Sequence, residues 1–161
     1  DTSPAAAAQA PVFQVQRVYL KDASLEMPHA PSIFLESENP KVDVQLEVSD
    51  APVIEALHEV VVRVTVTAKV KEKTLFLVEA GQAGIFTIRN IPDADMEPIL
   101  GIACPNILYP YVREVVSDIV VRAGFPPVLL TPVNFEALFQ AQKQAQAEQQ
   151  KEASPIIQAT H

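Results

Sequence analysis

Cysteine, glycine and long apolar runs are all scarce in this chain of 161 residues. Its single cysteine, Cys104, rules out an internal disulfide and fits a reducing compartment, so we expect a cytoplasmic protein. Its 4 glycines form neither of the common glycine-rich phosphate-binding motifs, which argues against nucleotide-driven chemistry. No apolar run is long enough to span a bilayer, so the sequence predicts no direct membrane insertion.

Positive charge and metal-ligating side chains are also sparse. The net charge of −8 argues against a nucleic-acid partner, because phosphates need a basic surface, and it favours a basic protein partner. The 3 histidines lack the spacing of metal ligands, so neither a metal nor a cofactor is expected. Cys104 has no basic neighbour in the sequence and is interpreted as a small buried hydrophobe. We therefore expect a protein that is not an enzyme.

Four segments alternate between apolar and polar residues as β-strands do. They are residues 13–27, 41–48, 58–70 and 74–88, with 49–57 expected to be a loop. The short turn at 71–73 predicts that the last two strands form an antiparallel hairpin. In the fourth strand, Leu75, Leu77 and Glu79 are expected on one face, while Gly81 and Gly84 indicate a bulge or a close backbone approach.

The second half of the chain predicts helices separated by a proline-rich segment. A short helix is expected within 93–103, capped by Asp93 or Asp95. A long amphipathic helix is expected to begin near Pro110, because proline suits a first turn, and to end at Gly124. Residues 125–133 are apolar, extended and rich in proline, and Asn134 is expected to cap a second helix that ends near residue 149.

Strands that precede helices in the chain predict an α+β fold. We expect a four-stranded antiparallel sheet with the long amphipathic helix packed on it, a proline-rich crossover and a second, C-terminal helix. Residues 12–149 are expected to form one domain, between a disordered leader at 1–11 and a disordered tail at 150–161. The leader lacks the basic and hydrophobic regions of a secretory signal.

Two features remain as candidate binding surfaces. The proline-rich crossover and the aromatic residues around it either seal the core or offer an apolar surface to a partner. On the outward sheet face, Leu77 among acidic residues indicates either a solvated surface or an interface centre with a polar rim. Val121 also interrupts the polar face of the long helix beside Ser117 and Asp118, a mixture that suits a wet subunit interface.

Four segments together resemble the SecB family of bacterial export chaperones. They are FQVQRVYLKDASLEMP, EVVVRVTVTAKV, LVEAGQAGIFTI and LGIACPNILYPYVREVVSDIVVRAGFPPVLLTPVNFEALF, in order between residues 13 and 139. The resemblance implies an ATP-independent holdase that binds unfolded preproteins, keeps them translocation-competent and delivers them to the SecA motor of the Sec translocase. It also implies a homotetramer built as a dimer of dimers, with any zinc carried by the C-terminal tail of SecA.

The same resemblance implies roles for particular positions. The residues implied to bind SecA are Asp22, Glu26, Leu77 and Glu79. The residues implied to line a substrate groove are Leu108, Tyr109, Tyr111, Phe125, Leu129, Leu130, Val133, Phe135 and Phe139. The residues implied to act in the tetramer interface are Val78, Ala80, Gln82, Ser117, Asp118 and Val121. Glu38 stands where some relatives have tryptophan, so one part of the groove is expected to be less aromatic.

Two alternatives remain at this point. A SecB-like chaperone dedicated to a toxin–antitoxin partner would share the fold but have a narrow range of clients. A small-ligand-binding α+β domain would need a closed pocket with convergent polar groups, whereas the crossover predicts an open apolar surface.

Overall fold

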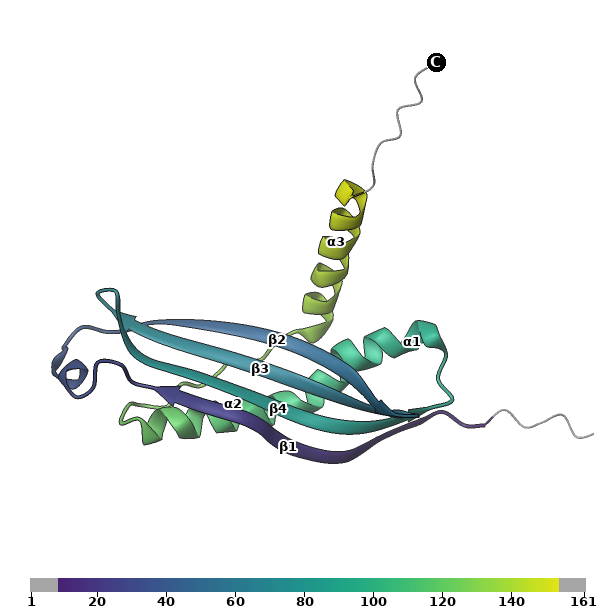
Figure 1. Cartoon of the computed structure of the whole chain (residues 1–161), viewed down its shortest axis with the longest axis horizontal. Coiled ribbons are helices and arrows are strands. Elements are labelled where there is room, and N and C mark those ends of the chain that lie inside the picture. Colours follow the sequence, from purple (N-terminus) through teal and green to yellow (C-terminus); the bar gives the residue numbers. More distant parts are fainter. Residues whose placement is uncertain (1–8, 154–161) are drawn as a thin grey trace, which may run out of the picture.

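The structure, a computed structural model, describes residues 9–153. It is an antiparallel sheet of four strands with a long helix along one face, as Figure 1 shows, which confirms the predicted α+β fold. The strands are β1 (Val12–Glu26), β2 (Lys41–Ile54), β3 (Leu57–Val70) and β4 (Lys73–Arg89). Their order across the sheet is β1-β4-β3-β2, so β1 and β2 form its two edges.

β3 supplies the centre of the hydrophobic core. Every second side chain faces the helix layer, and Val60, Val62, Val64 and Val66 are completely buried. Burial of one valine side chain contributes about 1.5–3 kcal/mol. The alternation predicted for this strand is therefore confirmed, as is the hairpin that joins β3 to β4.

β2 is longer than the sequence predicted. Residues 49–54, expected to be a loop, continue the strand because Asp50 and Pro52 still face Val60 and His58 in the antiparallel register with β3.

The predicted outward position of Leu75 is wrong. A register shift after Ala68 turns Leu75 into the core, where it is 5% exposed, while Leu77 keeps the expected outer face. One extra residue in a bulge resets the alternation for the rest of the strand.

An almost continuous helical stretch follows the sheet. It consists of α1 (Asp93–Pro98), the π-helix η2 (Ile99–Ala103) and α2 (Cys104–Arg122). The prediction that the long helix begins near Pro110 is wrong, because Pro110 lies inside α2. Pro110 and Asn106 are both exposed, and the proline leaves the Asn106 carbonyl without its usual N–H partner.

α1 confirms the short helix that was expected within 93–103, but not its cap. The helix follows Pro92 and has no side-chain cap; Asp93 and Asp95 lie in its first turn instead. Acidic side chains in a first turn interact favourably with the helix dipole.

α2 packs on β3 and β4 through a buried stripe at helical spacing. Leu108, Val112, Val116 and Val120 form this stripe. α2 covers the central strands β3 and β4 better than the edge strand β2, so Val42 on the inner face of β2 remains 43% exposed. An apolar strip along β2 is thus left open beside the helix layer.

The connection between β1 and β2 crosses one end of the sheet, since these strands are at opposite edges. It contains the short 3-10 helix η1 (Ser32–Leu35), which is anchored by the buried side chain of Ile33.

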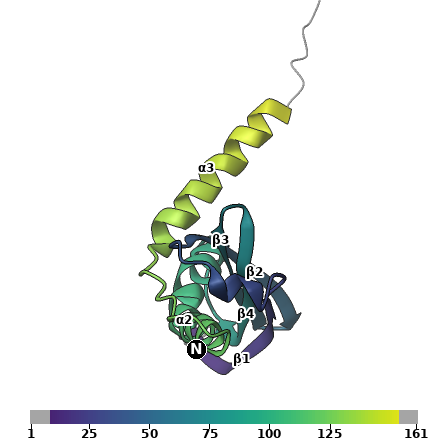
Figure 2. The ribbon, with the colours of Figure 1, turned by 90° about the vertical axis from the view of Figure 1, so that its left-hand side faces the viewer.

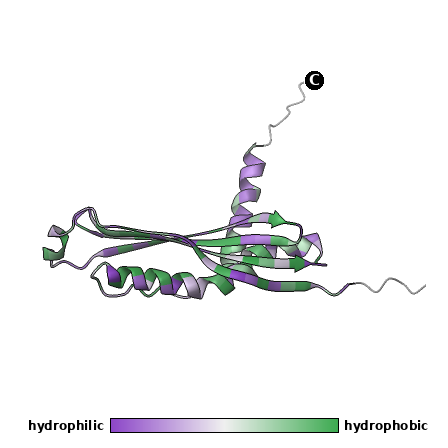
Figure 3. Cartoon of the chain, turned by 60° about the horizontal axis from the view of Figure 1, so that its bottom comes forward, coloured by the Kyte–Doolittle hydropathy of each residue, from purple (hydrophilic) through white to green (hydrophobic). Residues whose placement is uncertain are grey.

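The last helix, α3 (Phe135–Ala153), projects away from both layers (Figure 2). As predicted, Asn134 caps it, with the Ala137 N–H donating to Asn134 Oδ1 at 3.0 Å. Beyond its base the helix is mostly hydrophilic, as the purple colouring in Figure 3 shows. It runs to Ala153, past the expected end near 149; the remaining parts of the predicted leader and tail, residues 1–8 and 154–161, lie outside the described residues.

Candidate functional site

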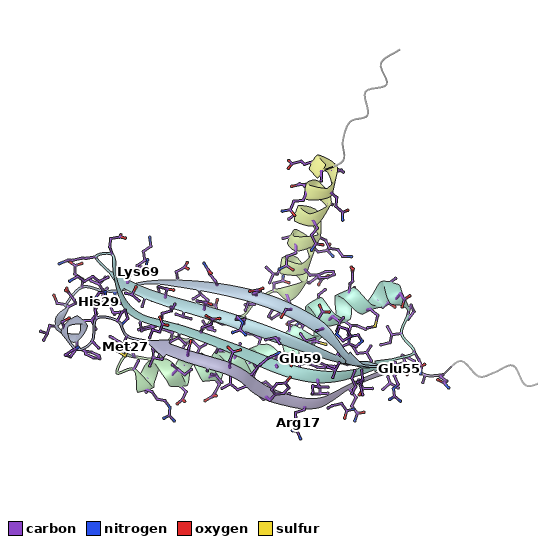
Figure 4. All side chains as sticks on the ribbon, viewed as in Figure 1. Arg17, Met27, His29, Glu55, Glu59 and Lys69 are labelled. Atoms are coloured by element: carbon purple, nitrogen blue, oxygen red, sulfur yellow. The ribbon has the colours of Figure 1, made fainter. Side chains whose placement is uncertain are left out.

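An open apolar hollow lies at the end of the sheet where β3 turns into β4, between β2, η1 and the start of the crossover. Figure 4 marks this end of the sheet with Met27, His29 and Lys69. The apolar side chains that line this hairpin-end hollow include Phe34, Val42, Leu75, Phe76, Phe125 and Val128.

Three aromatic rings give the hairpin-end hollow its shape. The Phe125 ring stacks on Phe34 with 5.3 Å between ring centroids, and it lies equally close to Phe76 at a tilt of 43°. The rim is acidic, with Glu36 and Glu38; Lys71 pairs with Glu38 at 3.3 Å. Glu38 therefore does line this hollow, and its carboxylate makes that part of the rim polar.

A second hollow lies between β2, η2 and the base of α3. We call it the α3-base hollow; its lining is mixed, with the apolar residues Val48, Leu100, Leu138 and Phe139 beside Gly101 and the polar residues Asp50, Glu97, Gln142, Lys143 and Gln146. Lys143 ties α3 to α1 through an ion pair with Glu97 at 2.9 Å, and its ammonium lies 5.1 Å from the Phe139 ring centroid. The base of α3 is therefore held against η2 while the rest of the helix projects outward.

The inner face of β2 connects the two hollows. Val42 lines the hairpin-end hollow, Val48 lines the α3-base hollow, and Val44 between them is 47% exposed. Six residues of strand span roughly 20 Å. We call the two hollows and this apolar strip the β2 groove.

The structure does not bring the nine predicted groove residues together. Phe125 and Phe139 line the two hollows, and Val133 packs partly buried against the core. Four others are buried in the core and line neither hollow: Leu108, Tyr109, Leu130 and Phe135. The remaining two, Tyr111 and Leu129, are exposed outside the β2 groove.

Tyr109 is one of the predicted groove residues that the structure places in the core. Its hydroxyl donates a hydrogen bond to the Thr131 carbonyl, and its ring meets Phe135 edge-on at 5.7 Å. Burial raises the pKa of this phenol. Tyr109 therefore fastens the crossover to α2 and leaves no face for a ligand.

The four residues implied to bind SecA do come together. The register of β1 and β4 places Glu26 opposite Leu77, with Glu79 and Asp22 one and two steps farther along the same outer face. This outer-face patch lies on the side of the sheet opposite α2.

Sequence reasoning missed a cation at the centre of that patch. Arg63 on β3 donates from Nη1 and Nη2 to the two carboxylate oxygens of Asp22, at 2.6 and 2.7 Å, and from Nη1 to Glu79 Oε1 at 3.1 Å. These hydrogen bonds lower the pKa of the Asp22 carboxyl. The alternation of β3 already placed Arg63 on the outer face, which is the signal that would have found it.

A second polar cluster lies next to the patch. Glu59, labelled in Figure 4, accepts a hydrogen bond from the Tyr19 hydroxyl and pairs with Lys21 at 2.6 Å. Burial, together with the Glu59 carboxylate, raises the pKa of Tyr19 to about 12.

The predicted interface positions divide into two groups. Ser117, Asp118 and Val121 line a shallow depression on the outward side of α2 beside Leu129. The other three, Val78, Ala80 and Gln82, are buried beneath α2 and so cannot touch a neighbouring subunit directly in this packing. Further apolar side chains remain exposed on β1, namely Phe13, Val15, Leu20 and Leu25.

The described residues do not support a cysteine nucleophile, a metal site or a membrane-spanning helix. Burial raises the pKa of the Cys104 thiol to about 12, as expected of a buried hydrophobe and not of a nucleophile. Within residues 9–153 no group of His, Cys, Asp and Glu is arranged to hold a metal ion. No helix in that range is long and apolar enough to cross a membrane.

Comparisons with known proteins identify the family to which the chain belongs. The family model described as preprotein translocase subunit SecB matches residues 6–146. The protein-export protein SecB of Nitrosomonas eutropha is 56% identical over 154 residues, covering 94% of this chain and 96% of its own. The protein of that name from Methylibium petroleiphilum is 59% identical, covering 91% of this chain and 94% of its own.

A solved structure shares the fold at much lower identity. It is a SecB-like chaperone of Mycobacterium tuberculosis in complex with a peptide from the HigA1 antitoxin, with a TM-score of 0.62 and 16% identity over 75% of this chain and 90% of that one. The family-model match and the high identity to export proteins decide the assignment: this chain belongs to the SecB family of protein-export chaperones.

Proposed function

We propose that this protein is an ATP-independent holdase that binds unfolded preproteins in the β2 groove and delivers them to SecA through the outer-face patch. A ligand that binds the unfolded chain and not the native one shifts the folding equilibrium toward the unfolded chain by mass action. The observation that carries the proposal is that an open apolar groove and an acidic patch lie on opposite faces of one sheet. Client and motor can therefore be bound at the same time.

The β2 groove suits an extended polypeptide. Its two hollows are roughly 20 Å apart, a distance that six or so extended residues span. The hairpin-end hollow takes apolar side chains and has few polar groups, so it distinguishes client sequences only weakly. The hollow at the base of α3 is more polar, with Asp50, Gln142 and Lys143 beside Leu138 and Phe139. Several such weak contacts along one client add through effective concentration to give tight binding.

The outer-face patch suits a basic partner. Its acids remain accessible, with the Asp22 and Glu79 side chains 50% and 43% exposed beside Leu77. We infer that the partner segment is the basic, zinc-bearing C-terminal tail of SecA, so any zinc belongs to the partner.

We also propose a homotetramer built as a dimer of dimers. The exposed Val121 on α2 and the exposed apolar side chains of β1 are surfaces that a second copy would cover. Ser117 and Asp118 would surround Val121 as the polar part of that interface. Because Val78, Ala80 and Gln82 are buried, their proposed effect on assembly is indirect, through the packing of α2 on the sheet.

General export in the cytoplasm is favoured over service to one toxin–antitoxin partner. The relatives named as export proteins are 56–59% identical to this chain, whereas the antitoxin-bound structure is 16% identical and supports the fold alone.

Two variants that place a positive charge in the outer-face patch test the proposal. Leu77→Arg and Glu79→Lys should abolish SecA binding, measured by titration calorimetry, and leave the binding of a permanently unfolded protein intact. Glu55→Lys, an exposed acid at the far end of the sheet in Figure 4, is the matched control and should bind SecA normally. Unchanged SecA binding in both patch variants would show that the docking site is assigned wrongly. Loss of SecA binding and client binding together would show the same.

A further inference from the structure

We propose that Arg63 is a positioning residue of the outer-face patch, where it holds Asp22 and Glu79 in the arrangement that a basic partner segment recognises. The inference rests on the proposed docking of SecA at this patch, and it adds a residue that carries the opposite charge. It also assigns a reason for the glycine at position 81.

The geometry joins three strands. Arg63 extends from β3 across Gly81 of β4 and ends on Asp22 of β1, because these three residues stand in one row of the antiparallel register. The guanidinium engages both oxygens of Asp22 and one oxygen of Glu79. Paired N–H donors in a planar fork fix the carboxylate plane as well as its distance, which a lysine ammonium does not do.

Gly81 provides the space for this arrangement. A Cβ atom built at position 81 would lie 2.9 Å from Arg63 Nη2 and 3.2 Å from Asp22 Oδ2. A side chain there would force the guanidinium to shift from this position and so change its hydrogen bonds to the two acids. The missing side chain at Gly81 therefore leaves the space that the Arg63 guanidinium occupies.

The exposure of the three side chains indicates that Arg63 orders the two acids and does not compete with the partner for them. Arg63 is 29% exposed, less than either acid it holds. Each carboxylate oxygen has two lone pairs, so both acids can still accept hydrogen bonds from a partner while Arg63 is in place. Nearby charges are Glu47, which faces Arg63 from β2, and Lys21, which pairs with Glu59. Arg63 therefore orders the acids and leaves their outer sides free.

Charge alone would give the opposite effect. Removing Arg63 makes the patch more negative, which by itself would tighten the binding of a basic segment. Positioning instead predicts weaker binding, because the partner must then order two freely rotating acids itself. The sign of the change separates the two explanations.

The experiment titrates purified SecA, and a peptide of its basic C-terminal tail, into Arg63→Gln, Arg63→Lys and Gly81→Ala. We expect Arg63→Gln to weaken both interactions roughly fivefold, the upper range for one exposed ion pair. Arg63→Lys should recover part of the loss. Gly81→Ala, which changes no charge, should weaken binding in the same direction. Tighter or unchanged binding by Arg63→Gln, or normal binding by Gly81→Ala, would overturn the proposal.

Further variants separate this inference from the docking assignment itself. Asp22→Asn and Glu79→Gln should weaken SecA binding; if neither does, the docking assignment fails and the role of Arg63 with it. If they weaken binding and Arg63→Gln does not, only the positioning role fails. Binding of a permanently unfolded protein should stay normal in every variant, and a parallel loss would identify Arg63 as a merely structural residue.

Discussion

The ring of Phe139 on α3 lies directly on Gly101 of the π-helix η2. A Cβ atom at position 101 would stand 2.6 Å from Cδ2 of this ring. The π-helix thus presents a surface without a side chain at the place where α3 meets the body of the protein. One turn farther along α3, the Lys143–Glu97 ion pair completes the attachment.

Gly101→Ala should therefore destabilise the protein although alanine is the better helix former. Alanine favours a helix over glycine by about 1 kcal/mol, but forced overlap in a packed site costs about 1–3 kcal/mol. We expect a lower melting temperature by circular dichroism and faster proteolysis of α3.

A double-variant cycle provides the control for Gly101→Ala. In a Phe139→Ala background the overlap is gone, so the same substitution should be neutral or stabilising. An equal cost in both backgrounds would show that the ring does not rest on Gly101.

Val42→Asp should weaken client binding. The side chain lies on the floor of the β2 groove at 43% exposure, and a charge there opposes the burial of client apolar groups. We expect roughly tenfold lower affinity for a permanently unfolded protein, equivalent to about 1.4 kcal/mol.

Val53→Asp is the matched control for the groove, because Val53 is an exposed valine of the same strand that lines neither hollow. Equal losses from Val42→Asp and Val53→Asp would place client binding elsewhere.

Val121→Asp should shift the assembly from tetramers toward dimers. It buries a carboxylate in the proposed interface next to Asp118, so repulsion adds to the cost of desolvation. Light scattering after size exclusion measures the mass directly, and a mass equal to that of the unchanged protein would remove α2 from the interface.

Tyr19 makes stability depend on pH in the alkaline range. Its folded-state pKa of about 12 is above the value near 10 of an unfolded tyrosine. The neutral phenol is therefore favoured in the folded state, and this contribution to stability is complete below pH 10 and disappears as the pH rises through 12.

Denaturant unfolding at several alkaline pH values measures this loss, and Tyr19→Phe should flatten the dependence across the same interval. An ultraviolet titration in which all 3 tyrosines ionise together near pH 10 would contradict the assignment.

The sequence predicted the architecture well where local pattern dictates structure. Strict alternation in 58–70 identified β3, the turn at 71–73 identified the hairpin, and Asn134 identified the start of α3. Glycine at 81 indicated a close approach, and Arg63 proved to be the group that approaches.

The errors occur where packing overrides local pattern. α2 continues through Pro110, and a bulge turns Leu75 inward, neither of which periodicity can show. The groove residues implied by the family resemblance stay a prediction. The hairpin-end hollow joins Phe34, Val42 and Phe125 from three separate segments, which only the tertiary fold brings together.

The central claim is that this chain assembles and holds unfolded protein without nucleotide. Light scattering after size exclusion, with and without a permanently unfolded polypeptide and in the absence of ATP, tests it most directly. We predict a tetramer-sized particle whose mass increases by that of the polypeptide. A monomer whose mass does not change when the polypeptide is added would contradict the account.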